Sequence, residues 1–134
     1  MHMQGRPGTM QNNPVYKDVC LDILKILRDK VHALRSKGQK DIIVDPGFGF
    51  GKTIEQNYEL LKGLSSFRIL DCPILAGVSR KSMIYKLLKN TPGEALNGTT
   101  VLNTFALERG AKILRVHDVK EAVECVQLIN QLQA

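Results

Sequence analysis

The sequence predicts an α/β fold in which parallel strands alternate with helices, and three observations support this prediction. Three short segments rich in β-branched residues have strand character, at residues 42–44, 74–78 and 113–116. A helical pattern follows each of them. Each segment also ends abruptly in polar side chains. Strands joined through helices run parallel, so we expect these polar ends to meet on one face of the sheet.

The first helix is expected over residues 15–37. Asn13 can cap a helix, and Pro14 suits a first helical turn. An apolar stripe at helical spacing then continues until Gly38, which occupies the usual stop position.

The later helices carry start and stop signals of the same kind. Thr53 and Gln56 have the spacing of a capping box, and a helix should follow them. A short helix is expected after the second strand, and a longer one over 94–109. Asp118 and Glu121 form another apparent capping box, at the start of the last helix.

The chain is expected to be a single partial domain spanning residues 1–134. Its length fits at most one domain. Three parallel strands would form an open sheet, and proteins normally pair or cover such edges. The first residues also resemble a loop that follows a strand, with no strand before them. These features suggest the second half of a larger fold.

Composition narrows the functional classes. No apolar stretch approaches the roughly 20 residues that span a bilayer, and the first residues do not resemble a signal peptide. Three widely spaced cysteines fit neither a disulfide framework nor a zinc site, so we expect a reducing cytoplasm. The net charge of +6 is spread along helix faces with few aromatic residues, which favours an anionic small substrate over nucleic acid.

The glycine-rich segment 45–53 follows the first strand directly. A phosphate-binding P-loop would need glycine where Pro46 stands, and a dinucleotide-binding loop would need glycine or alanine in place of Lys52. Asp45 is therefore the main functional candidate of this segment. It could bind a ligand with a guanidine-like pair of N–H groups, or it could cap backbone N–H groups of the loop.

Ser79, Arg80, Lys81 and Ser82 lie between the second strand and a helix start. Two cations at a helix N-terminus oppose the helix dipole, which suggests that they serve a ligand. The alternative is a solvated basic turn.

Arg115 and His117 share one face of the third strand by the two-residue period. A guanidinium and an imidazole at one strand end suit a phosphate or a diphosphate. The main alternative is a structural salt bridge between Arg115 and Asp45, because buried charges are usually paired. His32 falls on a charged helix and is expected at the surface.

Three motifs together resemble dihydropteroate synthase over essentially the whole chain. They are Asp45-Pro-Gly-Phe-Gly-Phe-Gly-Lys-Thr, Gly77-Val-Ser-Arg-Lys-Ser82 and Arg115-Val-His-Asp118, preceded by the opening Met1-His-Met-Gln-Gly. That family has a (β/α)₈ TIM barrel of about twice this length. The resemblance therefore implies the second half of such a barrel, with three parallel strands and alternating helices.

The resemblance also implies a role for individual residues. The pterin would contact Met1, Asp45, Gly77 and Lys81, whereas 4-aminobenzoate would lie beside Phe50 and Ser82. Arg115 and His117 would hold the diphosphate, and together with Lys81 they would be the catalytic residues. The family uses Mg²⁺ with the diphosphate, but the resemblance gives this chain no metal ligand, because the family's asparagine ligand belongs to the other half.

The implied activity is that of a folate-biosynthesis transferase and sulfonamide target. It condenses 6-hydroxymethyl-7,8-dihydropterin diphosphate with 4-aminobenzoate to give dihydropteroate and diphosphate. The family associates through helices of this half, so a homodimer is expected. We expect the chain alone to be catalytically incomplete, and a non-catalytic half-barrel binding or assembly module remains the alternative.

Overall fold

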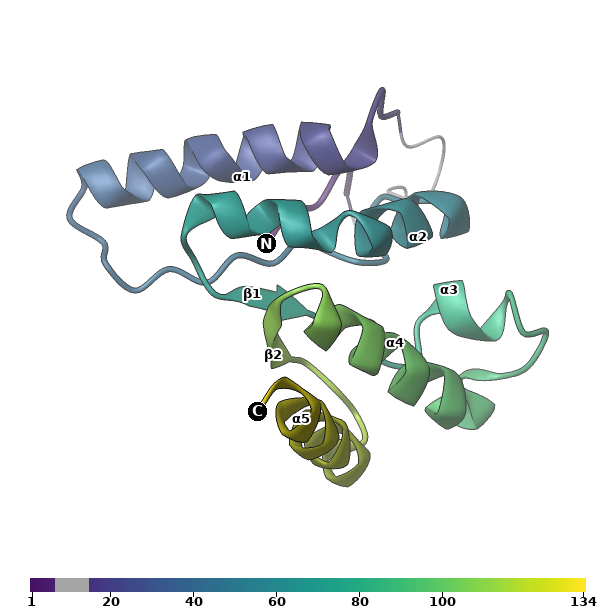
Figure 1. The fold of residues 1–134 in the computed structure, drawn as a ribbon. Coiled ribbons are helices and arrows are strands. Elements are labelled where there is room, and N and C mark those ends of the chain that lie inside the picture. The colour runs from purple at the N-terminus through teal and green to yellow at the C-terminus, as the bar shows by residue number, and fades with distance from the viewer. Residues whose placement is uncertain (7–14) are drawn as a thin grey trace.

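A computed structural model describes residues 1–6 and 15–134 (Figure 1). Its elements are α1 (Val19–Ser36), α2 (Ile54–Lys62), the 3-10 helix η1 (Leu64–Leu70), β1 (Ile74–Ala76), α3 (Ser82–Tyr85), the 3-10 helix η2 (Pro92–Glu94), α4 (Leu96–Glu108), β2 (Ala111–Leu114) and α5 (Val119–Gln133). The two strands pair in parallel. The predicted α/β class is therefore confirmed.

The segment expected to form the first strand joins the sheet through a single bridge, between Val44 and Ile74. Val44 donates to Pro73 O at 2.9 Å and accepts from Leu75 N at 2.8 Å. A parallel ladder would continue through the N–H groups of residues 73 and 46, but both residues are prolines, which have none. The sheet of the described residues therefore has two strands where three were predicted.

Helix α1 begins four residues later than expected. Asp18 is its N-cap, and its Oδ1 accepts from Leu21 N at 2.9 Å. The proposed cap at residues 13–14 lies outside the described residues. Gly38 has a φ of +86°, as expected of the residue that follows a helix. The apolar stripe of α1 is buried against η1 and α2; its buried members are Val19, Ile23, Leu27 and Val31.

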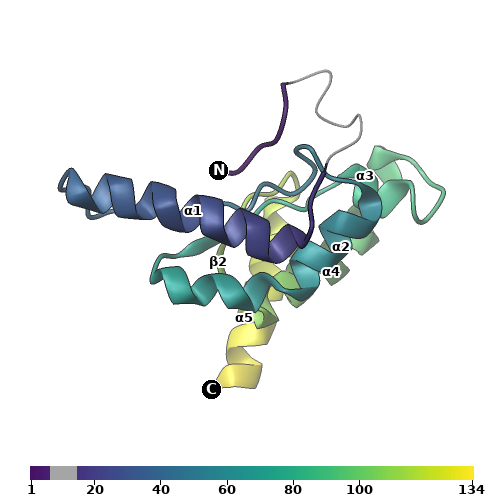
Figure 2. The same cartoon turned by 90° about the horizontal axis from the view of Figure 1, so that it is seen from above.

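The helices form two groups along the strands. In the view of Figure 1, α1 and α2 lie above them, and α4 and α5 lie below and pack against each other. Figure 2, from above, shows the N-terminal segment at the upper edge of the molecule. Among the described residues, no helix is long and apolar enough to cross a membrane.

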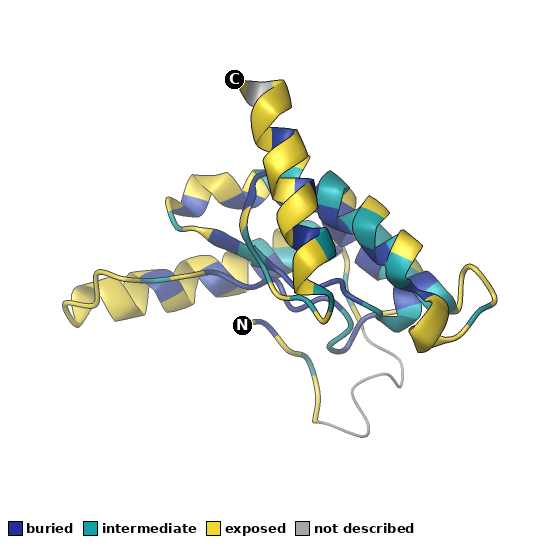
Figure 3. Cartoon of the chain, turned by 90° about the horizontal axis from the view of Figure 1, so that it is seen from below, coloured by how far each residue is buried: buried dark blue, intermediate teal, exposed yellow. Residues whose placement is uncertain are grey.

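The two faces of the strands differ in burial. Val44, Ile74 and Ala76 point toward the helices and are buried, whereas Leu75 and Ile113, which pair with each other, are partly exposed. Ile43 is 53% exposed. The face of the strands that carries Ile43 is therefore open. Figure 3 shows a similar contrast along α5, where buried residues occupy only one side of the helix.

Candidate functional site

The open face continues beyond the strand ends as a row formed by Asp45, Gly77 and Arg115. Asp45 is only 6% exposed, and its Oδ2 lies 3.4 Å from the Arg115 guanidinium. A Cβ atom at position 77 would lie 3.0 Å from that guanidinium, so Gly77 leaves the space through which Arg115 reaches Asp45. Three segments far apart in the sequence thus meet at one rim, as parallel strand ends predict.

Asp45 makes the loop cap that was one of its two alternatives and also the salt bridge that was the alternative for Arg115, whereas binding of a ligand stays a prediction. Its Oδ1 accepts from Gly47 N at 2.8 Å, and its other oxygen pairs with Arg115. A carboxylate offers about four lone-pair sites, so these two partners leave room for a pair of ligand N–H groups. The Arg115 side chain is 51% exposed, which leaves its remaining donors accessible at the rim.

His117 forms the next pair along the rim. Its Nδ1 lies 2.8 Å from Ser79 Oγ, and its backbone N–H donates to the same oxygen at 3.2 Å. Ser79 is buried and His117 is exposed, so Ser79 orients an accessible imidazole. This contact spans 38 residues and was not predicted, because Ser79 was expected only to precede a helix.

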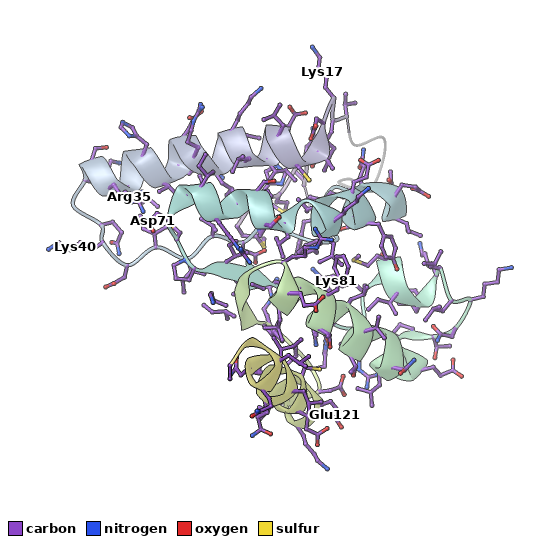
Figure 4. The ribbon with its side chains drawn as sticks, viewed as in Figure 1. Lys17, Arg35, Lys40, Asp71, Lys81 and Glu121 are labelled. Carbon is purple, nitrogen blue, oxygen red and sulfur yellow. The ribbon has the colours of Figure 1, made fainter. Side chains whose placement is uncertain are left out.

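Lys81 crosses the rim toward the glycine-rich segment, and Figure 4 labels it near the centre of the view. Its Nζ donates to Phe48 O and lies 4.8 Å from the centroid of the Phe50 ring. Burial lowers the pKa of Lys81 to about 8; Arg115 lowers it as well, and Asp45 opposes both effects. Lys81 is therefore a cation whose charge depends on its neighbours at the rim.

A pocket of about 290 Å³ lies beside Lys81 and is shared by two of the predicted motifs. Phe50 and Ser82 both line it, as expected of residues that border one ligand. The remaining lining residues are Phe48, Gly49, Arg80, Lys81, Tyr85 and Pro92.

Met1 lies beside the same rim. The next residue, His2, donates its backbone N–H to Asp45 O at 2.9 Å, which brings the start of the chain against the end of the first strand segment. The Met1 side chain is 49% exposed. Of the predicted pterin contacts, Asp45 and Gly77 thus adjoin Arg115, Lys81 lies across the glycine-rich segment, and Met1 stands at the margin.

Arg80 serves the protein itself, contrary to the interpretation that both cations of this turn face a ligand. Its Nε and Nη2 each donate to Asp118 at 2.8 Å, and its Nη1 donates to Pro92 O at 2.8 Å and Gly93 O at 2.7 Å. The predicted capping box at the last helix is wrong, because Asp118 makes no side-chain cap. Its carboxylate holds Arg80 instead.

We expect Asp118→Asn to lower the thermal unfolding midpoint at pH 7. The hydrogen bonds from Arg80, assisted by its charge, lower the pKa of Asp118. A lowered carboxyl pKa stabilises the fold above the ordinary value of about 4, and this contribution is lost as the pH falls through the native value. Thermal unfolding at pH 7 and pH 3 should therefore differ less for the variant than for wild type. Glu124→Gln, on the exposed side of α5, is the matched control. An unchanged midpoint for Asp118→Asn would contradict a stabilising role for the Arg80–Asp118 pair.

Lys52 points into the protein. It is 2% exposed, and its Nζ donates to Gly47 O at 2.6 Å and to Phe50 O at 3.0 Å. In a P-loop the lysine reaches out to phosphates, so this geometry does not match that alternative. This inward orientation of Lys52 was not predicted from the sequence.

Known proteins show similarity over nearly the whole chain. The sequence profile of the family described as "pterin binding enzyme" matches residues 1–117. Dihydropteroate synthase of Escherichia coli (strain K12) is 43% identical over 131 residues, covering 96% of this chain and 46% of that protein. The chain therefore spans about half the length of the curated relatives it matches.

Solved structures agree with the sequence comparison. The chain matches a Yersinia pestis dihydropteroate synthase in a sulfonamide drug complex with a TM-score of 0.94 and 40% identity, over 98% of this chain and 49% of that one. A Xanthomonas albilineans dihydropteroate synthase in complex with 7,8-dihydropteroate matches with a TM-score of 0.86 and 35% identity, over 90% of this chain and 47% of that one. The chain belongs to the pterin binding enzyme family.

Proposed function

We propose that this chain carries the C-terminal half of a dihydropteroate synthase, including part of its pterin and diphosphate sites. The observation that carries the proposal is the row of Asp45, Gly77 and Arg115 at one rim. It combines a nearly buried carboxylate with a half-exposed guanidinium at parallel strand ends. The motif residues of dihydropteroate synthase thus occupy a common edge.

A half-barrel architecture fits the burial pattern. In a complete barrel the inward side chains form a packed core. Here Ile43, Leu75 and Ile113 are exposed or partly exposed, whereas residues that point toward the helices are buried. An uncovered inner face is what half of such a barrel would present, and the chain aligns with about half of the Yersinia pestis enzyme.

The proposed chemistry is charge separation during loss of diphosphate. Asp45 would bind the guanidine-like edge of the pterin through its remaining lone pairs and hold the ring in place. Arg115 and His117 would receive the diphosphate as its negative charge grows, and Lys81 would lie between the pterin and the 4-aminobenzoate beside Phe50 and Ser82. These positively charged and hydrogen-bonding groups would favour departure of the diphosphate from the pterin methylene carbon.

Magnesium is assigned to no residue of this chain. Across the described residues, no three side chains of His, Cys, Asp or Glu are grouped so that they could hold a metal ion. We propose that a magnesium ion accompanying the diphosphate would be held mainly by the diphosphate oxygens and by groups outside this chain. Because the chain spans about half the length of the dihydropteroate synthases it matches, we propose that this polypeptide alone forms negligible dihydropteroate.

Titration of 6-hydroxymethylpterin, followed through its fluorescence, tests the proposed function. We expect wild type to bind, and Asp45→Asn to bind about 100-fold more weakly, because loss of a charged partner in a buried hydrogen-bonded pair costs about 2–5 kcal/mol. Asp41→Asn, at the exposed start of the same segment, is the matched control. Equal affinity for wild type and Asp45→Asn would reject the assignment of Asp45.

The second candidate is a binding or assembly module, and exposed apolar residues on α5 favour it. Val119, Val123 and Val126 recur at helical spacing on one side of α5 and are 64%, 49% and 36% exposed. We propose that this face of α5 supports a homodimer. Failure of wild type to bind pterin, together with a dimer in sedimentation velocity, would favour the module over the transferase fragment. A cytoplasmic location is proposed from the three cysteines, which are all free thiols.

A further inference from the structure

The glycine loop, defined as residues 46–51, has an unusual backbone. Gly47, Gly49 and Gly51 have φ values of +75°, +82° and +65°. Side chains at two of these positions would collide with the N-terminal segment: a Cβ at 47 would lie 1.8 Å from His2 O, and one at 51 would lie 2.3 Å from Gln4 O. This shape is accessible only to glycine, and it requires partners for the peptide groups that it turns away from regular structure.

Side chains from outside the loop supply those partners. Gly49 N donates to Asn57 Oδ1 at 2.7 Å, and Gly51 O accepts from the Tyr16 hydroxyl at 3.0 Å. Both contacts anchor the loop to neighbouring helical segments, because Asn57 belongs to α2 and Tyr16 lies just before α1.

Two lysines bind the loop carbonyls. Lys52 donates to the carbonyls of Gly47 and Phe50, and Lys81 donates to the carbonyl of Phe48 between them. Lys52 Nζ also lies 3.3 Å from His2 Nδ1. Burial, and next the charge of Lys52, lower the pKa of His2 to about 4, so the neutral imidazole can accept from the ammonium.

We propose that Lys52 is a positioning residue that holds the glycine loop in the shape that presents the Phe48 carbonyl and the Phe50 ring to Lys81. The hydrogen bonds of Lys52 and Lys81 to the loop carbonyls support this role without any ligand. Its consequence for substrate, that Lys52 fixes the wall of the pocket shared by Phe50 and Ser82, rests on the proposed function.

An apolar side chain could not take over this role. Met at position 52 would fill similar space but would leave the carbonyls of Gly47 and Phe50 without their charged donor inside the protein. Unsatisfied buried carbonyls are unfavourable, so the loop should turn them toward water. That movement would carry the Phe48 carbonyl and the Phe50 ring away from Lys81.

Nuclear magnetic resonance of the ligand-free chain, with ¹³C,¹⁵N-labelled lysine, tests the proposal. Because the Lys81 ammonium lies over the Phe50 ring, its neighbouring methylene protons should be shifted upfield by the ring current and should show Overhauser contacts to the ring. Phe50→Leu defines the complete loss of this shift. We expect Lys52→Met to lose more than half of it and to lose the Overhauser contacts.

Three further variants make the result specific. Lys62→Met removes an exposed lysine from α2, and Leu27→Ala destabilises the buried stripe of α1; both should keep the Lys81 shift. Lys52→Gln keeps a donor without the charge and should lose less of the shift than Lys52→Met. A folded Lys52→Met with an unchanged Lys81 shift would overturn the proposal, and so would failure of both position-52 variants to fold, because Lys52 would then be needed by the whole core. Since no ligand is present, failure of pterin binding would leave this test intact.

Discussion

Gly47→Ala is expected to lower the free energy of unfolding by about 3 kcal/mol and to release the start of the chain. A non-glycine residue in the left-handed region costs roughly 1–2 kcal/mol. The new Cβ would also lie 1.8 Å from His2 O, a backbone atom that cannot move without loss of its contacts. The hydrogen bond from His2 N to Asp45 O and the contact between Lys52 and His2 should break, each at a cost of about 1 kcal/mol.

Gly38→Ala is a matched control for this effect. Gly38 has a φ of +86°, but a Cβ there would meet nothing within 4 Å. It should therefore show only the backbone cost, and urea denaturation of both variants separates that cost from the collision. Limited proteolysis should cleave the N-terminal segment faster in Gly47→Ala alone. Equal stability of the two variants would mean that the contact with His2 contributes nothing.

The convergence of charges was predictable because parallel strands fix where their ends lie. Asp45, Lys81 and Arg115 are far apart in the sequence, yet each lies at or just beyond the end of a predicted strand. The direction of the strands therefore sufficed to bring them to one rim. The pairing of Arg115 with Asp45 was a stated alternative because buried charges are usually paired, and it is observed.

The first predicted strand is wrong because its apolar pattern says nothing about the hydrogen bonds that its neighbours can make. Residues 42–44 have strand composition, but Pro46 and Pro73 remove the donors on either side of the Val44 bridge. Both prolines are visible in the sequence. The pairing register that makes them decisive is visible only in the structure.

The partners of Arg80 could not be predicted, because each contact joins distant segments. Asp118 and Glu121 have the spacing of a capping box, but the Asp118 carboxylate accepts from Arg80, which lies 38 residues earlier, and caps no helix N–H group. Arg35 is a similar case at the opposite end of the strands, where it donates to the Asp71 carbonyl at 2.9 Å; Figure 4 labels the two residues close together. Sequence patterns predict only the hydrogen bonds between residues that are close in the sequence. At Asp118 the carboxylate instead binds a partner that is distant in the sequence.

The free energy of unfolding is expected to rise by about 2 kcal/mol between pH 7 and pH 9, and Lys52 and Lys81 are the cause. Burial lowers the pKa of each lysine from 10.5 to about 8; each is also lowered by a neighbouring cation and raised by Asp45. The unfolded chain therefore holds more protons than the native protein above pH 8, and stability increases with pH in that range. Linkage gives about 1 kcal/mol for each lysine by pH 9.

Other groups limit the pH window in which this rise can be observed. Burial lowers the pKa of His2 to about 4, so its contribution is complete before pH 7. Burial raises the pKa of the Cys20 thiol and raises the pKa of Tyr16 to about 12. Ionisation of the Cys20 thiol in the unfolded chain begins near its ordinary pKa of about 8.5 and offsets part of the rise by pH 9, whereas Tyr16 ionises only near pH 10. The lysines are therefore the main contribution between pH 7 and pH 8.

Urea denaturation at pH 7, 8 and 9 measures the effect, and single variants assign it. Lys81→Met should keep about half of the rise, since Lys52 remains buried, and Lys62→Met should keep all of it. Stability that stays level or falls across this interval would show that neither lysine is held at a depressed pKa. The proposed function would then lose the desolvated cation at Lys81 that we propose to stabilise the growing negative charge of a diphosphate.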